Sequence, residues 1–167
     1  HHYIIADDWV IPEGSELYYS ERVLRLPCYQ PNDRKRLVAE QRPLRAEAGL
    51  PEDGFVFCCF NAAHKITRFS FERWCEILKS SPGSVLWLLD FGVETNHRLA
   101  AHAETFGVDA ARLVHAQKIA NPYHLARYPL ADLVLDTIPY GAHTTASDAL
   151  WMGVPVLTLS GRSFASR

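Results

Sequence analysis

Five short apolar runs recur along the chain from residue 55 onward. They read FVFCCF, VLWLL, LVHA, LVLD and PVLTL, and β-branched and aromatic residues are frequent in them. Apolar runs of this length without polar alternation are typical of strands that are buried on both faces of a parallel sheet. The sequence therefore predicts buried parallel strands over the C-terminal two thirds of the chain.

Segments with helical spacing separate these runs. Between Phe71 and Leu78 the apolar residues lie three or four positions apart, and Pro82-Gly83 follows; a weaker pattern runs from Leu99 to Phe106. Alternating strands and helices form right-handed crossovers, and ligands bind at the carboxyl ends of the strands in such sheets. We predict an α/β fold with a Rossmann-like, doubly wound parallel sheet.

The first fifty residues lack this rhythm. Four prolines interrupt residues 12–43, and a mixed-charge stretch over 33–47 predicts a short exposed helix. We divide the chain into a connector at 1–50 and a lobe at 51–167. Because Tyr3-Ile4-Ile5 resembles the end of a strand and the chain stops at Arg167, we expect both ends to be cut and the lobe to be truncated at its C-terminus.

Composition restricts the partners. The formal net charge of −2 gives no general attraction to nucleic acid or to an anionic membrane, and no apolar run approaches the roughly 18 residues that span a bilayer. We therefore predict neither nucleic acid nor a membrane as partner. Phosphate recognition would have to come from a few placed residues.

Cysteine and histidine spacing argues against disulfides and metals. The four cysteines show neither a disulfide framework nor metal-site spacing, which favours reduced thiols and a cytoplasmic location. His97 and His102 are five residues apart and miss the spacing of a metal-binding pair on a helix. We predict no metal.

The segment from Leu130 to Arg167 has the pattern strand, polar loop, helix, strand. It places His143, Thr144, Thr145 and Asp148 at the start of a helix after a buried strand. Free N–H groups and the positive dipole end make such a helix start a phosphate site. A helix cap formed by Thr145 and Asp148 explains the same residues without a ligand, and the two interpretations are compatible.

Lys65 follows the first strand of the lobe, in a loop that also contains Asn61 and His64. One ammonium group at this place can neutralise charge on a diphosphate, although an exposed surface lysine is the alternative. Other catalytic classes lack their motifs: the chain has no phosphate loop of the Gly-Lys-Ser/Thr type, no Gly-x-Ser-x-Gly elbow and no Gly-x-Gly-x-x-Gly fingerprint.

Together these motifs resemble a known family. FNAAHKI at 60–66, DTIPYGAHTT at 136–145, SDALWMGVPV at 147–156 and the final FASR are similar to bacterial members of the O-linked N-acetylglucosamine transferase family, also called SPINDLY. The resemblance implies the C-terminal catalytic lobe of a GT-B glycosyltransferase. Gly141 and Ala142 differ from some members, so the shape of their loop stays open.

This resemblance implies an activity and its participants. The enzyme would transfer N-acetylglucosamine from UDP-N-acetylglucosamine to protein Ser or Thr hydroxyls with inversion, release UDP and need no metal or other cofactor. The acceptor and the general base would belong to a missing N-terminal lobe and its helical repeats, so we expect the fragment alone to be inactive. The alternatives are a protein fucosyltransferase that uses GDP-fucose and a non-catalytic nucleotide-sugar-binding module.

The resemblance also implies roles for individual residues. Lys65 would contact the pyrophosphate and stabilise the leaving diphosphate, and Asp148 would bind the ribose hydroxyls. His124 would stack on or bond to uracil, with Arg127 nearby. The predicted site thus comprises Lys65, His124, Arg127, His143, Thr144, Thr145 and Asp148.

Overall fold

A five-stranded parallel sheet forms the centre of the chain. The computed structural model describes residues 1–29 and 33–166. The strands lie in the order β5-β4-β3-β6-β7, and every pair is parallel. All five predicted strands are confirmed. Their bounds are β3 (Val56–Cys59), β4 (Val85–Leu89), β5 (Leu113–Ala116), β6 (Leu133–Leu135) and β7 (Val156–Leu157).

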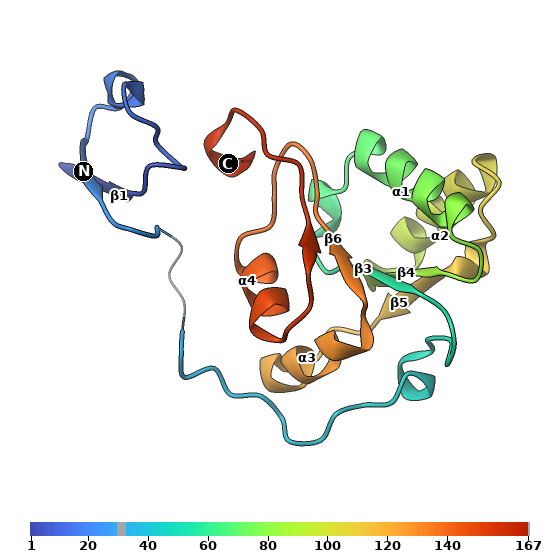
Figure 1. Ribbon diagram of the computed structural model, residues 1–167. Helices are drawn as coiled ribbons and strands as arrows, with labels where there is room; N and C mark the ends of the chain where they lie inside the picture. Colours follow the sequence, from blue (N-terminus) through green and yellow to red (C-terminus); the bar gives the residue numbers. More distant parts are fainter. Residues whose placement is uncertain (30–32, 167) are drawn as a thin grey trace.

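Helices cover both faces of this sheet (Figure 1). Helices α1 (Arg68–Ser80) and α2 (Val93–Thr105) pack on one face, and α3 (Asn121–Arg127) and α4 (Thr144–Trp151) pack on the other. The doubly wound, Rossmann-like prediction is confirmed. Short 3-10 helices complete the set: η1 (Ser15–Tyr18), η2 (Ala46–Ala48), η3 (Ala63–Lys65), η4 (Ala110–Arg112), η5 (Tyr128–Leu130) and η6 (Phe164–Ser166).

The apolar spacing of the sequence explains the two layers. Phe71, Trp74 and Leu78 are buried and pack α1 against the sheet, as their spacing predicts. Trp87 from β4 and Leu125 from α3 belong to the core on the opposite face. Successive residues of a strand point to opposite faces, so an uninterrupted apolar strand can supply both cores.

The strand order reverses between β3 and β6. The chain proceeds from β3 to β4 on one side of the sheet, and from β6 to β7 on the other. The loops that follow β3 and β6 therefore diverge at the carboxyl end of the sheet. In open α/β sheets this divergence creates the crevice where ligands bind.

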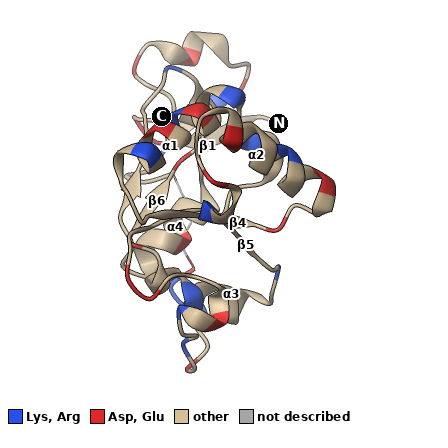
Figure 2. Cartoon of the chain, turned by 90° about the vertical axis from the view of Figure 1, so that its right-hand side faces the viewer, with Lys and Arg blue, Asp and Glu red and all other residues tan. Residues whose placement is uncertain are grey.

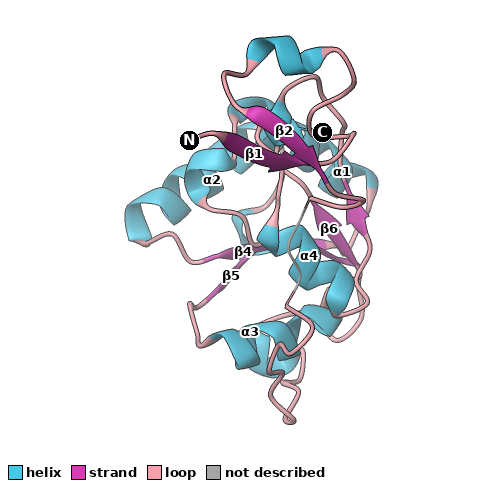
Figure 3. Cartoon of the chain, turned by 90° about the vertical axis from the view of Figure 1, so that its left-hand side faces the viewer, coloured by secondary structure: helices cyan, strands magenta, loops and turns pink. Residues whose placement is uncertain are grey.

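The first 29 residues are more regular than the sequence indicated. Strands β1 (Tyr3–Ala6) and β2 (Arg22–Arg25) pair in parallel over a small core of Ala6, Val10 and Ile11. Phe164 packs against that core, and its ring centroid lies 5.6 Å from that of Tyr29. Figure 3 accordingly shows the β1–β2 pair beside the C-terminal end of the chain.

Residues 33–45, here called the strap, run across the lobe without helical structure. The helix predicted over 33–47 is wrong, since η2 supplies the helical turn found at the end of this stretch. The backbone N–H of Ala39 donates to the carbonyl of Pro122 at 3.0 Å, and Arg45 forms an ion pair with Asp132 at 3.0 Å. Partners on the lobe thus hold the strap extended.

Cys58, Cys59 and Cys75 are buried free thiols. Burial raises the pKa of Cys59 to about 12 and that of Cys75 to about 11, so both thiols stay protonated at neutral pH. Among the residues that the structure describes, no helix combines the length and the apolar character that crossing a membrane requires.

The packing generates a prediction about stability. Leu88 is fully buried in β4, so Leu88→Ala is expected to lower the free energy of unfolding by about 2–5 kcal/mol in urea titrations. Val93→Ala is the control, because Val93 is 87% exposed and its truncation should change stability by less than about 0.5 kcal/mol. Equal effects of the two substitutions would contradict the assignment of the core.

Candidate nucleotide-binding site

The side chain of Asn61 joins the two loops that diverge from β3 and β6. Its Nδ2 donates to Asp136 Oδ1 at 3.2 Å and to Thr137 Oγ1 at 2.9 Å, and its Oδ1 accepts from the hydroxyl of Thr145. Asn61, Asp136 and Thr137 are buried. One amide therefore connects the end of β3, the end of β6 and the first turn of α4.

The carboxylate of Asp136 organises the loop after β6. Its Oδ1 accepts the backbone N–H groups of Thr137 and Ala142, each at 2.7 Å, and its Oδ2 accepts the hydroxyl of Thr158 at 2.7 Å. A Cβ on Gly141 would lie 3.1 Å from Asp136 Oδ2 and 3.2 Å from the carbonyl oxygen of Ala165. The close fit explains why a residue without a side chain stands at position 141. It also settles the shape of the loop, which the sequence left open.

Lys65 reaches from the β3 side of the crevice to the loop after β6. It ends η3, and its Nζ donates to the carbonyl of Gly141 at 3.2 Å and lies 4.3 Å from the ring centroid of Tyr140. Within residues 1–29 and 33–166, no carboxylate forms an ion pair with this ammonium group. A cation held by a carbonyl and a ring keeps its charge available for an anion.

Helix α4 begins at Thr144, with His143 as the N-cap residue. The predicted cap formed by Thr145 and Asp148 is wrong: Thr145 is already the second helical residue, and its hydroxyl bonds to Asn61 instead. Among the described residues, the backbone N–H groups of Thr144, Thr145 and Ala146 have no protein partner. The start of α4 therefore offers the free donors and the dipole that suit a phosphate.

His143 and Asp148 lie at different places relative to this start. The His143 ring centroid lies 5.6 Å from that of Tyr140, and its Nε2 is buried without a hydrogen-bond partner in the described part of the chain. Asp148 is buried one turn further along α4, where its Oδ1 contacts Arg36 Nη1 at 2.6 Å. Burial raises the pKa of Asp148, and the positive charge of Arg36 opposes that rise.

His124 packs beside the same crevice. Its ring centroid lies 5.0 Å from that of Phe60, the neighbour of Asn61. Its Nδ1 contacts Nη2 of Arg127, and because a guanidinium can only donate, Nδ1 accepts and Nε2 carries the proton. Burial, and secondarily the charge of Arg127, lowers the pKa of His124 to about 4. The ring is therefore neutral at physiological pH.

The guanidinium of Arg127 lies in the protein interior. It is 5% exposed, donates to the carbonyl of Gln117 at 2.7 Å, and lies 4.7 Å from the ring centroid of Phe60 and 5.7 Å from that of Trp87. The structure thus bonds Lys65 to the loop that precedes α4 and packs His124 against Phe60, the residue before Asn61. It turns Arg127 inward, behind His124.

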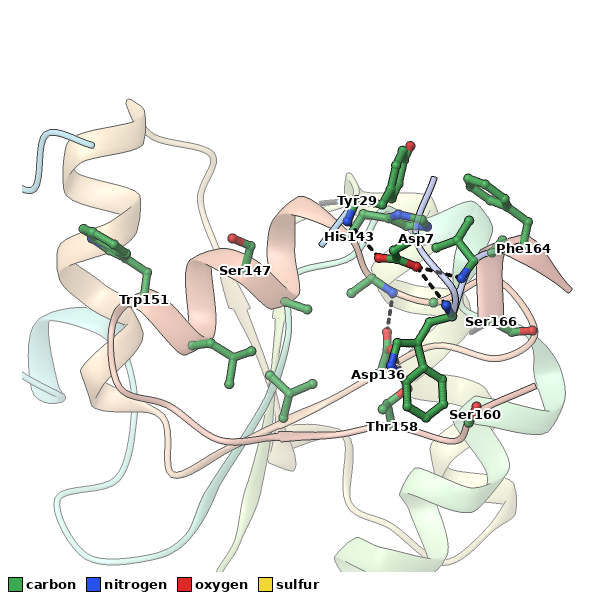
Figure 4. A pocket seen from close by; sticks show the side chains of 18 residues that line it. Asp7, Tyr29, Asp136, His143, Ser147, Trp151, Thr158, Ser160, Phe164 and Ser166 are labelled. Carbon is green, nitrogen blue, oxygen red and sulfur yellow. Dashed lines mark hydrogen bonds between the residues drawn. The ribbon is translucent and has the colours of Figure 1, made fainter. Parts of the chain in front are cut away.

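A cavity of about 790 Å³ opens between the N-terminal unit, α4 and the C-terminal segment. His143 is the predicted site residue that lines it, and Asp7 lines the same cavity (Figure 4). Sequence reasoning missed Asp7, Tyr29 and Asp136 as parts of this region. For Asp136 the signal was its place directly after a buried strand; for Asp7 and Tyr29 the sequence contained none.

No metal centre is apparent among the described residues, because they include no group of three His, Cys, Asp or Glu side chains that could hold an ion. Independence from a metal stays a prediction. Positively and negatively charged residues are interspersed along the chain in the view of Figure 2, and the net charge is −2. Attraction of an anion would therefore depend on local donors.

The fold defines the class of the protein, a Rossmann-like lobe of GT-B glycosyltransferases. Over 99% of the chain it superposes with TM-score 0.83 and 35% identity on a point mutant of the O-GlcNAc transferase of Thermobaculum terrenum, covering 31% of that protein. A sucrose-phosphate synthase from Thermosynechococcus elongatus shares the fold, with TM-score 0.65 and 18% identity over 92% of this chain and 39% of its own.

Sequence comparison narrows the class. The profile of glycosyl transferase family 41 matches residues 34–167, and the chain belongs to this family. A probable UDP-N-acetylglucosamine–peptide N-acetylglucosaminyltransferase SEC from Arabidopsis thaliana is 38% identical over 99% of the chain. A similarly named Caenorhabditis elegans protein is 39% identical over 74%, and a probable SPINDLY protein from Petunia hybrida is 30% identical over 95%. The chain spans 18%, 11% and 17% of these relatives, respectively.

The Asp136 network predicts a graded loss of stability. Asp136→Ala would leave two backbone N–H groups without their acceptor and remove one of the two bonds that the Asn61 amide donates, at a cost of about 3 kcal/mol or more. Asp136→Asn should cost less, because one oxygen can still face the donors. Urea titrations measure the free energy of unfolding of both variants. Asp53→Ala is the control, because Asp53 is exposed. An unchanged free energy of unfolding in Asp136→Ala would show that the network does not hold the loops.

The geometry around His124 predicts its titration. Because the folded-state pKa is about 4 and the unfolded value about 6.5, protonation favours the unfolded chain as the pH falls from 6.5 towards 4. NMR of the imidazole protons should show a midpoint near 4 for His124, and stability should decline over this range less in His124→Asn. A midpoint near 6.5 would contradict the buried contact with Arg127.

Proposed function

We propose that this chain is the donor-binding lobe of an inverting glycosyltransferase that transfers N-acetylglucosamine from UDP-N-acetylglucosamine to Ser or Thr hydroxyls of proteins. Membership of family 41 and the names of the relatives support this activity. The observation that carries the proposal is that the Lys65 ammonium group bonds to the carbonyl of Gly141, in the loop that leads into the free first turn of α4.

The reaction needs stabilisation of the departing diphosphate. As the bond from the anomeric carbon to the UDP oxygen breaks, negative charge grows on the diphosphate. The Lys65 cation and the N–H groups of Thr144 and Thr145 are fixed before the reaction, so they lower the energy of that charge without reorganising. These groups supply the stabilisation that a metal ion would otherwise provide.

The nucleoside would lie along α3 and α4. The neutral ring of His124 offers a face for stacking on uracil and an Nε2–H donor, and the Asp148 carboxylate offers acceptors for ribose hydroxyls. Arg127 would support the His124 ring from behind, because its guanidinium already bonds to Gln117 and His124.

The remaining participants are proposed from the relatives. We place the protein acceptor and the general base in parts of the longer relatives that this chain does not span, and we expect the chain alone to bind the donor without transferring sugar. Free thiols with raised pKa values support a reducing, cytoplasmic setting.

Calorimetric titration with UDP tests the site. Lys65→Met is expected to weaken UDP binding by about tenfold or more, because it removes the cation and keeps an apolar stem of similar length. Lys79→Met is the control, since Lys79 lies at the end of α1 and pairs with Glu76. Circular dichroism should show both variants folded. Unchanged affinity in Lys65→Met would refute the proposed role.

Thermal shifts test the identity of the donor. UDP and UDP-N-acetylglucosamine should raise the melting temperature, whereas GDP and GDP-fucose should leave it unchanged. Stabilisation by GDP but not by UDP would instead indicate a fucosyltransferase. Transfer of sugar to a protein by a longer form that includes the lobe, lost in Lys65→Met, would distinguish an enzyme from a binding module.

A further inference from the structure

Arg36 links the strap to α4 across 112 positions of sequence. Its Nη1 donates to Asp148 Oδ1 at 2.6 Å, and its Nη2 donates to Ser147 Oγ at 2.7 Å. The guanidinium carbon also lies 5.6 Å from the ring centroid of Trp151. Three residues on consecutive turns of α4 thus hold one side chain in place.

Arg36 and Asp148 form a pair that is largely withdrawn from water. Their side chains are 8% and 10% exposed. Taking two charges out of water costs free energy, so such a pair is weak evidence for added stability, whereas the loss of one partner leaves an uncompensated buried charge. The geometry therefore indicates a requirement for an ionised, oriented carboxylate at this place more than a requirement for stability.

The surroundings of Asp148 make Arg36 its source of positive charge. Arg36 from the strap bonds to it, and Tyr128 from η5 interacts with it electrostatically. Burial raises the pKa of Asp148, and a neighbouring phenol supplies no positive charge. Without the guanidinium, the proton on Asp148 would be lost only at a higher pH.

The strap also fixes where Arg36 can be. Ala39 bonds to Pro122 at the first turn of α3, and Arg45 bonds to Asp132 at the start of β6. The segment therefore contacts α3 through Ala39 and α4 through Arg36, and these two helices carry His124 and Asp148, the residues proposed to hold the nucleoside.

We propose that Arg36 is a positioning residue for nucleotide binding, which holds the Asp148 carboxylate charged and oriented so that it accepts hydrogen bonds from the ribose hydroxyls. This inference rests on the proposed function. Ribose hydroxyls are donors, and a charged acceptor binds them more strongly than a neutral one. Arg36 itself need not contact the nucleotide.

Two ligands isolate the effect. Calorimetry would compare UDP with 2′,3′-dideoxy-UDP, which carries the same base and pyrophosphate but lacks both ribose hydroxyls. In Arg36→Gln, affinity for UDP is expected to fall about tenfold while affinity for the dideoxy ligand changes less than about twofold. Asp148→Asn should show the same pattern, and the double variant should be no worse than either single variant.

The pH profile supplies a second readout. In Arg36→Gln the ratio of UDP to dideoxy-UDP affinity should fall as the pH is lowered, because Asp148 becomes protonated at a higher pH than in the wild-type chain, whereas the pyrophosphate titrates alike in both ligands. In Arg36→Lys this affinity ratio should not fall with pH, as in the wild-type chain, since lysine restores the positive charge beside Asp148. Arg34→Gln is the matched control, because Arg34 is an exposed residue on the same strap.

The outcomes separate this inference from the proposed function. If the wild-type chain fails to bind UDP, the proposed function fails. If Lys65→Met weakens UDP binding but Arg36→Gln weakens neither ligand, or weakens both equally, the inference is overturned and the proposed function stands. Melting curves identify an unfolded Arg36→Gln, in which case Arg36→Lys and Asp148→Asn still decide through the ligand ratio and its pH profile.

Discussion

The buried contact between Asn61 and Asp136 holds together the region on which the candidate site depends. It lies where the strand order reverses between β3 and β6, at the point where the two following loops diverge. Buried polar groups are costly unless they are bonded, so a network that satisfies amide, carboxylate and loop N–H groups together allows essentially one loop conformation. That conformation sets the start of α4 and the place that Lys65 can reach.

The electrostatics of the crevice follow from this scaffold. The chain has a formal net charge of −2, so no general field draws an anion to it. A single ammonium group is held by the carbonyl of Gly141 and the ring of Tyr140, in the loop that leads into the free N–H groups at the start of α4. Donors fixed in advance suit a reaction in which charge develops on a leaving diphosphate.

Two guanidinium groups in the chain bond to side chains that belong to the predicted site. Arg127 bonds to the acceptor nitrogen of His124 and so determines which ring nitrogen carries the proton. Arg36 bonds to Asp148 in a similar way. In both pairs the guanidinium can only donate, so it occupies one acceptor atom of its neighbour and determines which of the neighbour's atoms remain to bond with a ligand. The resemblance had placed Arg127 near the base, and its inward position refines that role.

The sequence by itself determined the five strands of the central sheet, the helices between them and the class of fold, because apolar periodicity reports burial directly. Its motifs also selected Lys65 and the residues at the start of α4. Only the tertiary structure decided that Thr145 bonds to Asn61 rather than capping its helix, that Arg127 turns inward, and that the strap is extended. These outcomes depend on partners tens of residues away, and local spacing contains no information on which distant polar group will satisfy a buried donor.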